Sequence, residues 1–385
     1  MTWPIKKLGD CLSQFDRGIS WSRKDEGGTV AVLRIPNIEE GHINLNDLKY
    51  IDPKNENGEL NKNDIVMVAS NGNPDLVGRS ALVTEKEKGM RFASFLIRLR
   101  FDSTKLLPQY AHLFLLTPTF KRELRRKIAT TSGIYNLKKE HIEKIKISLP
   151  PLGIQKQIVE RLDKIAEAQK LNDDLIQKAD ELYRSLLHNE LNAKFKNQNA
   201  KSQFKIKKLK EVADYINGRA FKPSEWGKSG LPIIRIQNLT ETQEKFNYFD
   251  GDVEDKYLVK DGDILLSWSA SLGVYIWDKG DAVLNQHIFK VVPRQDIDKE
   301  YLFHALIIAI ETLKRRVHGS TMTHVTKPIF NRVTIGVPPP ETQKQIVEKL
   351  SAIQDYKKKL LEQKSKLQEL FESVLDKSFK EDLVK

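Results

Sequence analysis

The sequence predicts an α+β protein built from two β-rich globular segments, each followed by one long helix. Three observations support this prediction: a duplication that spans most of the chain, short β-branched and aromatic runs in the first part of each copy, and a heptad pattern at the end of each copy. The expected globular segments are residues 1–145 and 196–332, the second opening with a basic linker, and the expected helical segments are residues 146–195 and 333–385.

The duplication is clearest where each long helix is expected to begin. Residues 145–163 read IKISLPPLGIQKQIVERLD and residues 333–351 read VTIGVPPPETQKQIVEKLS, with ten of nineteen positions identical. Ordinary composition would give about one match by chance. Upstream, residues 5–8 and 206–209 both read IKKL. The separation of matching positions falls from 201 to 188 along the chain, so the copies differ by deletions in loops.

The first part of each copy contains short runs that are typical of strands, bounded by Gly, Asn and Asp. In the first copy these runs are Thr29–Ile35, Ile65–Ala69, Ala81–Thr84 and Phe92–Phe101. In the second copy they are Ile233–Ile236, Ile264–Trp268, Val274–Trp277 and His287–Val292. Helices are expected at Gln109–Ile128 and Lys299–Val317, each ending in a basic cluster that suits the negative end of the helix dipole. Between the copies, residues 193–210 hold seven lysines and no acid, and are expected to form the basic linker.

Each Pro-Pro sequence is followed by a long amphipathic pattern. A seven-residue period sustained over four heptads predicts coiled-coil pairing, and the polar Asn172 within the stripe would fix its register. The alternative is that each helix packs on its own globular segment. The residues expected to pair the helices are Ile158, Leu162, Ile165, Asn172, Ala179 and Leu186 in the first helix and Ile346, Leu350, Ile353, Leu360, Leu367 and Val374 in the second.

Composition narrows the class of protein. The 385 residues carry 64 Lys and Arg against 52 Asp and Glu, a net charge of +12, and 39% of them are hydrophobic. No apolar run approaches the ~18 residues of a membrane-spanning helix, and the N-terminus lacks the apolar core of a secretion signal. The single Cys11 excludes an internal disulfide. We therefore expect a soluble, cytoplasmic protein without a membrane partner, whose basic charge suits nucleic acid.

No catalytic constellation is found in the sequence. Trp226-Gly227-Lys228-Ser229 resembles the end of a phosphate-binding loop, but Lys222 stands where the first glycine is required. His304, His318 and His324 lie near one another without spaced cysteines or paired acids, which makes a metal site a poor interpretation. We expect no metal and no cofactor in this chain.

Motifs in both copies resemble those of the specificity subunit of type I restriction–modification systems. In the first copy, residues 132–137 read SGIYNL and residues 149–152 read LPPL, followed by Gln155 and Ile158-Val159. The second copy is looser, with STMTHV at residues 320–325 and VPP at 337–339, followed by Gln343 and Ile346-Val347. The resemblance covers essentially the whole chain. The sequence departs from the family pattern at Ile154 and Thr342, where the family often has Glu, and His324 replaces the Asn found at position 136.

The resemblance implies a fold, a function and partners. Each globular segment would be a target-recognition domain that reads one half of a bipartite site on double-stranded DNA, and the two helices would pack antiparallel as a spacer, which gives a pseudo-two-fold internal repeat. Two methyltransferase subunits would perform adenine N6 methylation with S-adenosylmethionine, and two motor-nuclease subunits would complete the enzyme. This chain itself would be non-catalytic. Residues 71–74 and 268–271 differ between the copies, so we expect an asymmetric target.

The candidate DNA-binding residues are basic clusters at helix ends and polar loops after matched strands. Each set has a structural alternative: a solvated helix end, ordinary turn chemistry or, for Trp21 and Trp226, packing. In the first copy the candidates are Arg23, Lys24, Ser70, Asn71, Asn73, Arg79, Arg125, Arg126, Lys127, Thr130, Thr131, Ser132 and Tyr135. In the second copy they are Arg219, Lys222, Ser267, Trp268, Ser269, Ser271, Lys314, Arg315, Arg316, Ser320, Thr321, Thr323 and His324.

Two other functions remain open from sequence. One is a coiled-coil adaptor whose duplicated β-rich domains hold proteins, which would show no salt-dependent affinity for DNA. The other is a basic nuclease with an unrecognised site, which would cleave DNA as an isolated chain in the presence of metal.

Overall fold

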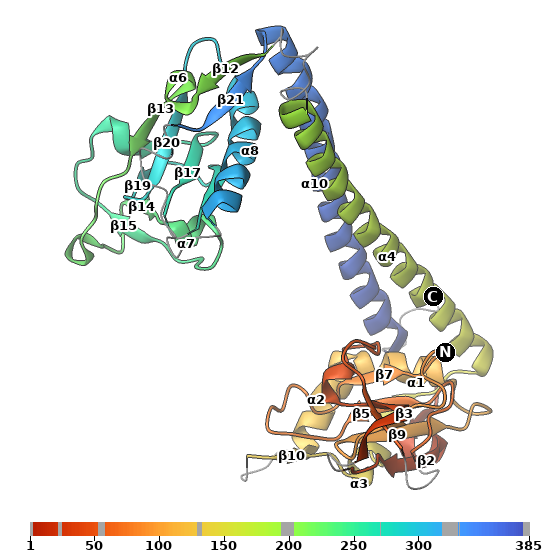
Figure 1. Cartoon of the computed structure of the whole chain (residues 1–385). Helices are drawn as coiled ribbons and strands as arrows, with labels where there is room; N and C mark the ends of the chain where they lie inside the picture. The colour runs from red at the N-terminus through yellow and green to blue at the C-terminus, as the bar shows by residue number, and fades with distance from the viewer. Residues whose placement is uncertain are drawn as a thin grey trace. The chain divides into compact units, whose positions relative to one another are not determined.

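The computed structural model describes residues 3–21, 25–52, 58–128, 133–193, 204–269, 271–317, 330 and 332–379. The chain divides into two compact units. Unit 1 comprises Met1–Asp173 and Glu362–Lys385, and unit 2 comprises Asp174–Leu361. Each unit therefore contains one β-rich globular part and a segment of both long helices, α4 (Leu152–His188) and α10 (Pro340–Phe379) (Figure 1).

The globular part of unit 1 is built on a four-stranded antiparallel sheet beside a three-stranded mixed sheet. The first sheet has the order β2 (Leu12–Arg17), β9 (Leu96–Phe101), β5 (Ile65–Val68), β7 (Ser80–Leu82), and the second β4 (Lys49–Ile51), β3 (Glu26–Leu33), β8 (Arg91–Phe92). Two short antiparallel pairs complete it: β1 (Ile5–Lys7) with β11 (Lys146–Ser148), and β6 (Ser70–Asn71) with β10 (Tyr135–Asn136). The helical elements are η1 (Leu8–Cys11), η3 (Ile35–Asn37), α1 (Pro108–Leu116), α2 (Pro118–Ile128) and α3 (Lys139–Glu143).

Unit 2 repeats this plan. Its first sheet has the order β13 (Ala213–Asn217), β20 (Ile288–Pro293), β17 (Ile264–Ser267), β18 (Gly273–Ile276), and its second β15 (Asn247–Phe249), β14 (Leu231–Ile234), β19 (Ala282–Leu284), β16 (Leu258–Val259). Strand β12 (Lys205–Lys208) pairs with β21 (Thr334–Val337) as β1 pairs with β11. The helical elements are α6 (Leu209–Val212), η5 (Pro223–Glu225), α7 (Ile236–Leu239), η6 (Asp255–Tyr257), α8 (Lys299–Val317) and the π-helical turn η4 (Asn189–Ala193) that follows α4.

Two sequence expectations need correction. The single helix expected at Gln109–Ile128 is two helices, because Pro118 cannot donate the backbone hydrogen bond that would continue α1, and the Thr117 hydroxyl instead accepts from Phe120 N at 3.2 Å. In unit 2, which has no proline there, α8 is continuous. The expected linker 193–210 is also partly structured, since Lys205–Lys208 form β12.

Each long helix is fastened to its globular part by one buried glutamine. Gln155 Oε1 accepts from Leu107 N at 2.8 Å, and its Nε2 donates to the carbonyl oxygens of Lys105 (3.1 Å) and Pro150 (2.9 Å). Gln343 repeats all three bonds with Asp298 N, Asp296 O and Pro338 O. The strongest block of the sequence repeat is therefore the junction between sheet and helix.

The first turns of each long helix belong to a globular core. In unit 1, Ile158 and Leu162 pack in the core that also holds Leu375 of α10. In unit 2, Ile346 and Leu350 pack in the core that holds Leu187 of α4. The stripe read as a helix–helix seam thus serves two purposes, because its beginning faces both the sheet layer and the other helix.

The two long helices run antiparallel within each unit. In unit 1, Gln169 Nε2 donates to Gln368 Oε1 at 3.1 Å and Asp173 pairs with Lys364 at 2.8 Å, so rising numbers in α4 meet falling numbers in α10. In unit 2, Asp180 pairs with Lys357 at 2.6 Å and Glu190 with Lys349 at 3.0 Å. The antiparallel arrangement implied by the resemblance is confirmed in both units.

The residues predicted to pair the helices line this contact to different degrees. Ile158, Leu162, Asn172, Ala179, Ile346, Leu350 and Leu360 are buried, whereas Ile165, Leu186, Ile353, Leu367 and Val374 are half-buried. In the described part of the chain, no helix is long and apolar enough to cross a membrane.

Candidate nucleic-acid interface

In unit 1, the pairing of β6 with β10 brings together polar residues that are distant in sequence. Asn71 lies opposite Tyr135, and Ser70 lies opposite Asn136. Arg17, at the end of β2, donates to Asn136 Oδ1 at 2.7 Å and to the Leu137 carbonyl at 3.3 Å. Sequence reasoning missed Arg17. Its position just before Gly18, at the end of a β-run, was the available signal.

The loop after β6 is shaped by two asparagines that were predicted to read bases. Asn71 Oδ1 accepts from Asn73 N at 2.8 Å, and Asn73 Oδ1 accepts from Asp75 N at 2.9 Å. These side chains therefore build successive Asx turns, so both the functional and the turn interpretations apply to them. Asn73 is exposed, and Asn71 is half-buried.

The basic cluster at the end of α2 lies beside the same loop. Arg125 forms an ion pair with Asp75. Arg79 and Lys121 help to line a cavity of about 120 Å³ between the loop and α2. Arg125 and Arg126 are exposed, and Lys127 is half-buried. Unit 1 thus gathers Arg17, Ser70, Asn71, Asn73, Arg79, Tyr135 and the α2 cluster near one edge, which we call the unit 1 edge.

In unit 2, the last residue of β17 and the residues after it form a different surface. Trp268 stacks on Phe289 with ring centroids 5.8 Å apart, and its indole N–H donates to Asn217 Oδ1 at 3.2 Å. Ser267 is fully buried, and its hydroxyl donates to the Ser271 carbonyl. Ser269 is also buried, while Ser271 is exposed. Ser267 therefore supports the turn from within, and Trp268 and Ser271 are the more accessible members.

The side chain of Arg219 interacts with two aromatic rings and a carboxylate of unit 2. Its guanidinium lies 4.6 Å from the Phe221 ring centroid and 4.9 Å from that of Phe249, and it forms an ion pair with Glu225. Lys222 is exposed nearby, and Trp226 carries Arg235 over its ring at 5.2 Å. This arrangement favours packing over base reading for Arg219 and Trp226.

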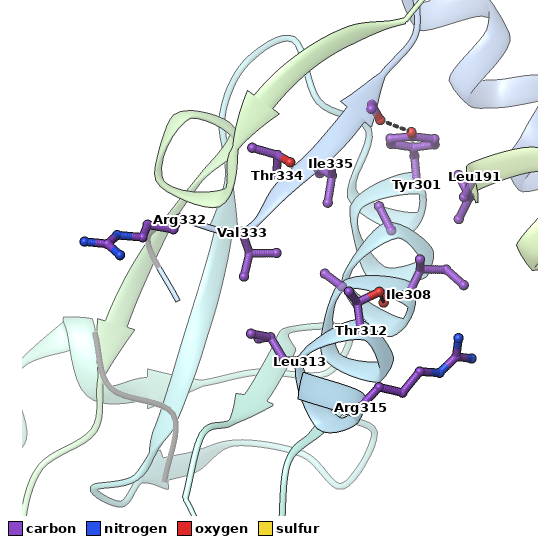
Figure 2. Close-up of a pocket in the computed structure, with 13 residues that line it drawn as sticks. Leu191, Tyr301, Ile308, Thr312, Leu313, Arg315, Arg332, Val333, Thr334 and Ile335 are labelled. Carbon is purple, nitrogen blue, oxygen red and sulfur yellow. Dashed lines mark hydrogen bonds between the residues drawn. The ribbon is translucent and has the colours of Figure 1, made fainter. Parts of the chain in front are cut away.

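The basic end of α8 borders a cavity of about 510 Å³ between α8 and β21. Lys314 and Arg315 are exposed, and Figure 2 shows Arg315 and Arg332 directing their guanidinium groups away from the apolar lining. In unit 1, the ring of Phe379 packs against the rings of Tyr110 and Phe114, with centroids 4.8 Å and 5.3 Å apart. In unit 2, the smaller Leu191 and Ala305 stand at the repeat positions of Phe379 and Phe114. The two units share the same backbone framework here, and the cavity in unit 2 results from side chains that are smaller than their counterparts in unit 1.

Several candidates lie outside the described residues. These are Arg23, Lys24, Thr130, Thr131, Ser132, Ser320, Thr321, Thr323 and His324, together with the side chain of Arg316. Among the residues that the structure describes, no three His, Cys, Asp or Glu side chains gather as metal ligands.

His304 is a buried core residue. Tyr183 Oη lies 2.9 Å from His304 Nδ1, and burial lowers the pKa of His304 from 6.5 to about 4. Burial lowers the pKa of His112 in unit 1 to about 4 as well. Both histidines therefore remain neutral in the folded protein at neutral pH.

These two histidines predict a loss of stability in acid. Between pH 6.5 and about 4 the unfolded chain binds protons that the folded chain excludes, so the free energy of unfolding falls as the pH falls through that window. Unfolding by urea at a series of pH values measures the slope. In His304→Gln the slope should be reduced, because one of the two groups is removed; an unchanged slope would contradict this origin.

The match to a known protein family occurs twice along the chain, once in each copy of the duplication. A family model described as "Type I restriction modification DNA specificity domain" matches residues 2–181 and again residues 201–370. The chain belongs to this family. It is a DNA specificity subunit of the type I restriction–modification class, with two specificity domains in tandem.

Named relatives agree over different lengths. The MjaVIII specificity subunit of Methanocaldococcus jannaschii is 24% identical over 404 residues, covering 97% of this specificity subunit and 90% of the relative. The EcoBI specificity subunit of Escherichia coli is 28% identical over 148 residues, which covers 38% of this chain and only 31% of that protein.

Solved structures share the fold. A chain from a structure of the type I R-M system has a TM-score of 0.67 at 18% identity, covering 99% of this specificity subunit and 98% of that chain. The S subunit from M. genitalium has a TM-score of 0.58 at 14% identity, with 98% and 96% covered. The duplicated fold is thus found in other specificity subunits at low sequence identity.

Proposed function

We propose that this specificity subunit reads an asymmetric, two-part site on double-stranded DNA, one part with the globular portion of each unit. It carries no reaction itself. Two methyltransferase subunits with bound S-adenosylmethionine methylate adenine N6, and two motor-nuclease subunits cleave unmodified DNA. One observation supports this proposal. The two units share equivalent hydrogen bonds in their frameworks, whereas the candidate DNA-binding residues that these frameworks carry differ between the units.

The framework is repeated at the level of single hydrogen bonds. The two buried glutamines make equivalent bonds, and Tyr110 and Tyr301 each donate to a carbonyl on the strand before a long helix. The candidate DNA-binding residues of the two units instead differ in chemistry. Unit 1 has Asn71, Asn73 and Tyr135, whereas unit 2 has an indole and serines. Because bases are distinguished by donors, acceptors and apolar groups, different edges select different base pairs.

Mapping N6-methyladenine across the genome, with and without this gene, tests the proposal. The expected result is the loss of methylation at one motif whose two parts differ in sequence. Asn73→Ala should relax the base preference in only one part, because Asn73 belongs to one unit. A palindromic motif, or methylation that does not depend on the gene, would contradict the proposal.

The basic ends of α2 and α8 are proposed to contact phosphates. Arg126→Ala combined with Arg315→Ala should weaken binding to all DNA sequences and flatten the plot of log K against log salt by about one unit for each lost contact. Fluorescence anisotropy from low to moderate salt measures the slope.

Two controls accompany this prediction. Arg126→Lys with Arg315→Lys keeps both charges and should keep the slope. Lys366→Ala removes an exposed charge on α10 instead, and should leave the slope unchanged. If the double alanine variant had the wild-type slope, these residues would not be at the interface. A wild-type chain with no salt-dependent affinity would favour a protein-binding adaptor.

A further inference from the structure

Phe95 is an exposed aromatic residue on a fixed backbone. Its side chain is 57% exposed, more than any other Phe, Tyr or Trp in the described part of the chain. The Leu96 N–H donates to the Ala93 carbonyl at 2.8 Å, which closes the turn between β8 and β9. The Phe95 carbonyl accepts from Ala69 N at 2.8 Å and from Ser70 N at 3.3 Å. The ring is therefore presented to solvent from a rigid turn.

A single exposed apolar side chain is ordinary, and it is the position of Phe95 that matters. Ser70, bonded to its carbonyl, is the first residue of β6 and pairs with Asn136. Ile134, just before β10, is 62% exposed. Two exposed apolar side chains thus belong to the unit 1 edge, among amide, hydroxyl and guanidinium groups.

The same position in unit 2 is built differently. The backbone N–H of Trp268 donates to the His287 carbonyl at 3.2 Å, just as the backbone N–H of Ala69 donates to the Phe95 carbonyl. His287 is therefore the counterpart of Phe95. The His287 ring is half-buried and meets the Trp268 ring edge-on, with centroids 5.0 Å apart. Unit 2 therefore covers this position with its own indole, whereas unit 1 leaves a phenyl ring open.

We propose that Phe95 is a specificity-determining residue of unit 1, whose ring makes an apolar contact with a base of the half-site. This inference rests on the proposed function. Two base surfaces offer the required chemistry: the methyl group of a thymine in the major groove, and the face of a base at an opened step. Exposed polar groups alone read donors and acceptors, so the ring adds a preference that hydrogen bonds do not supply.

The test uses the full-length chain and a duplex that contains the methylated motif, with a scrambled duplex for comparison. Phe95→Ala should bind the motif about tenfold more weakly, the size of one mismatched base pair, and should bind the scrambled duplex as before, with the same salt slope. Tyr50→Ala is the matched control, since Tyr50 is 47% exposed on β4 of the same unit. It should change neither affinity.

Two further measurements distinguish the base surfaces. If Phe95 contacts a thymine methyl, replacing one thymidine by deoxyuridine should weaken wild-type binding about as much as Phe95→Ala does. That replacement should add nothing in the variant, and Phe95→Leu should retain most of the affinity. If Phe95 contacts a base face, 2-aminopurine at that step should brighten with the wild type and not with Phe95→Ala, because alanine cannot unstack the step. Either result supports the inference.

Three outcomes would overturn it. One is a Phe95→Ala chain that discriminates the motif as well as wild type does. The second is an equal loss on both duplexes, which would indicate a general effect on binding. The third is a specific loss with no response to deoxyuridine or 2-aminopurine at any position. A wild-type chain that failed to discriminate the two duplexes would instead overturn the proposed function itself, and this inference with it.

Discussion

Replacing Gln155 with leucine is expected to lower the free energy of unfolding of unit 1 by about 4 kcal/mol. The side chain is fully buried and makes three hydrogen bonds to backbone groups. Leucine would leave the Leu107 N–H and the carbonyls of Lys105 and Pro150 without these partners, and each of these groups that leucine keeps from water costs roughly 1–3 kcal/mol. Gln343→Leu should have the same effect on unit 2, where the bonds are repeated.

Hydrogen exchange on the full chain is the appropriate measurement, because a protein of two units need not unfold in one step. In Gln155→Leu, the Leu107 amide should exchange faster while the Asp298 amide keeps its protection. Gln343→Leu should give the opposite result. Gln157→Leu and Gln345→Leu are matched controls, since both side chains are exposed two residues further along the same helices. If the control substitutions had comparable effects, the explanation by buried hydrogen bonds would fail.

The second large effect is expected from alanine at Gly18 or Gly218. A Cβ at Gly18 would lie 2.1 Å from the Phe92 carbonyl oxygen, and one at Gly218 would lie 2.1 Å from that of Asn285. Both contacts are with backbone, so the strand end must move, at a cost of about 3 kcal/mol. The movement would break the bond from Ile19 N to Phe92 O (2.8 Å) and displace the neighbouring Arg17 from the unit 1 edge.

The consequence for function should be confined to one part of the target. Methylation mapping with Gly18→Ala should show relaxed selection in the half read by unit 1, and mapping with Gly218→Ala in the other half. Gly153→Ala is the control, because a Cβ there meets nothing within 4 Å and alanine suits a helix. Stability equal to wild type in both test variants would contradict the close approach of the backbones.

Much of the fold could be predicted because it is repeated. The block around Gln155 and Gln343 located both sheet–helix junctions, and strand positions such as Ile65–Ala69 were close to the observed β5. The break between α1 and α2 was missed, since the helical pattern continues through Pro118 and only the missing N–H ends the helix. The double role of Ile158 and Leu162 was also missed, because one apolar stripe can face a sheet or a helix.

The candidate interface was predictable in part. Asn71 and Asn73 were selected from their place after a strand, yet their hydrogen bonds reveal that they also build the loop. Ser267 was selected by the same rule, and it is buried. Arg17, Phe95 and Ile134 carry no motif, and their place at the unit 1 edge depends on which strand ends meet.

The sequence by itself determined the duplication, the class of fold and the family, because repeated residues and periodic apolar positions are local properties that can be counted along the chain. Only the tertiary structure decided which side chains face solvent together. That outcome depends on strand pairings such as β6 with β10, between residues more than sixty positions apart, and on close backbone approaches that no linear pattern encodes.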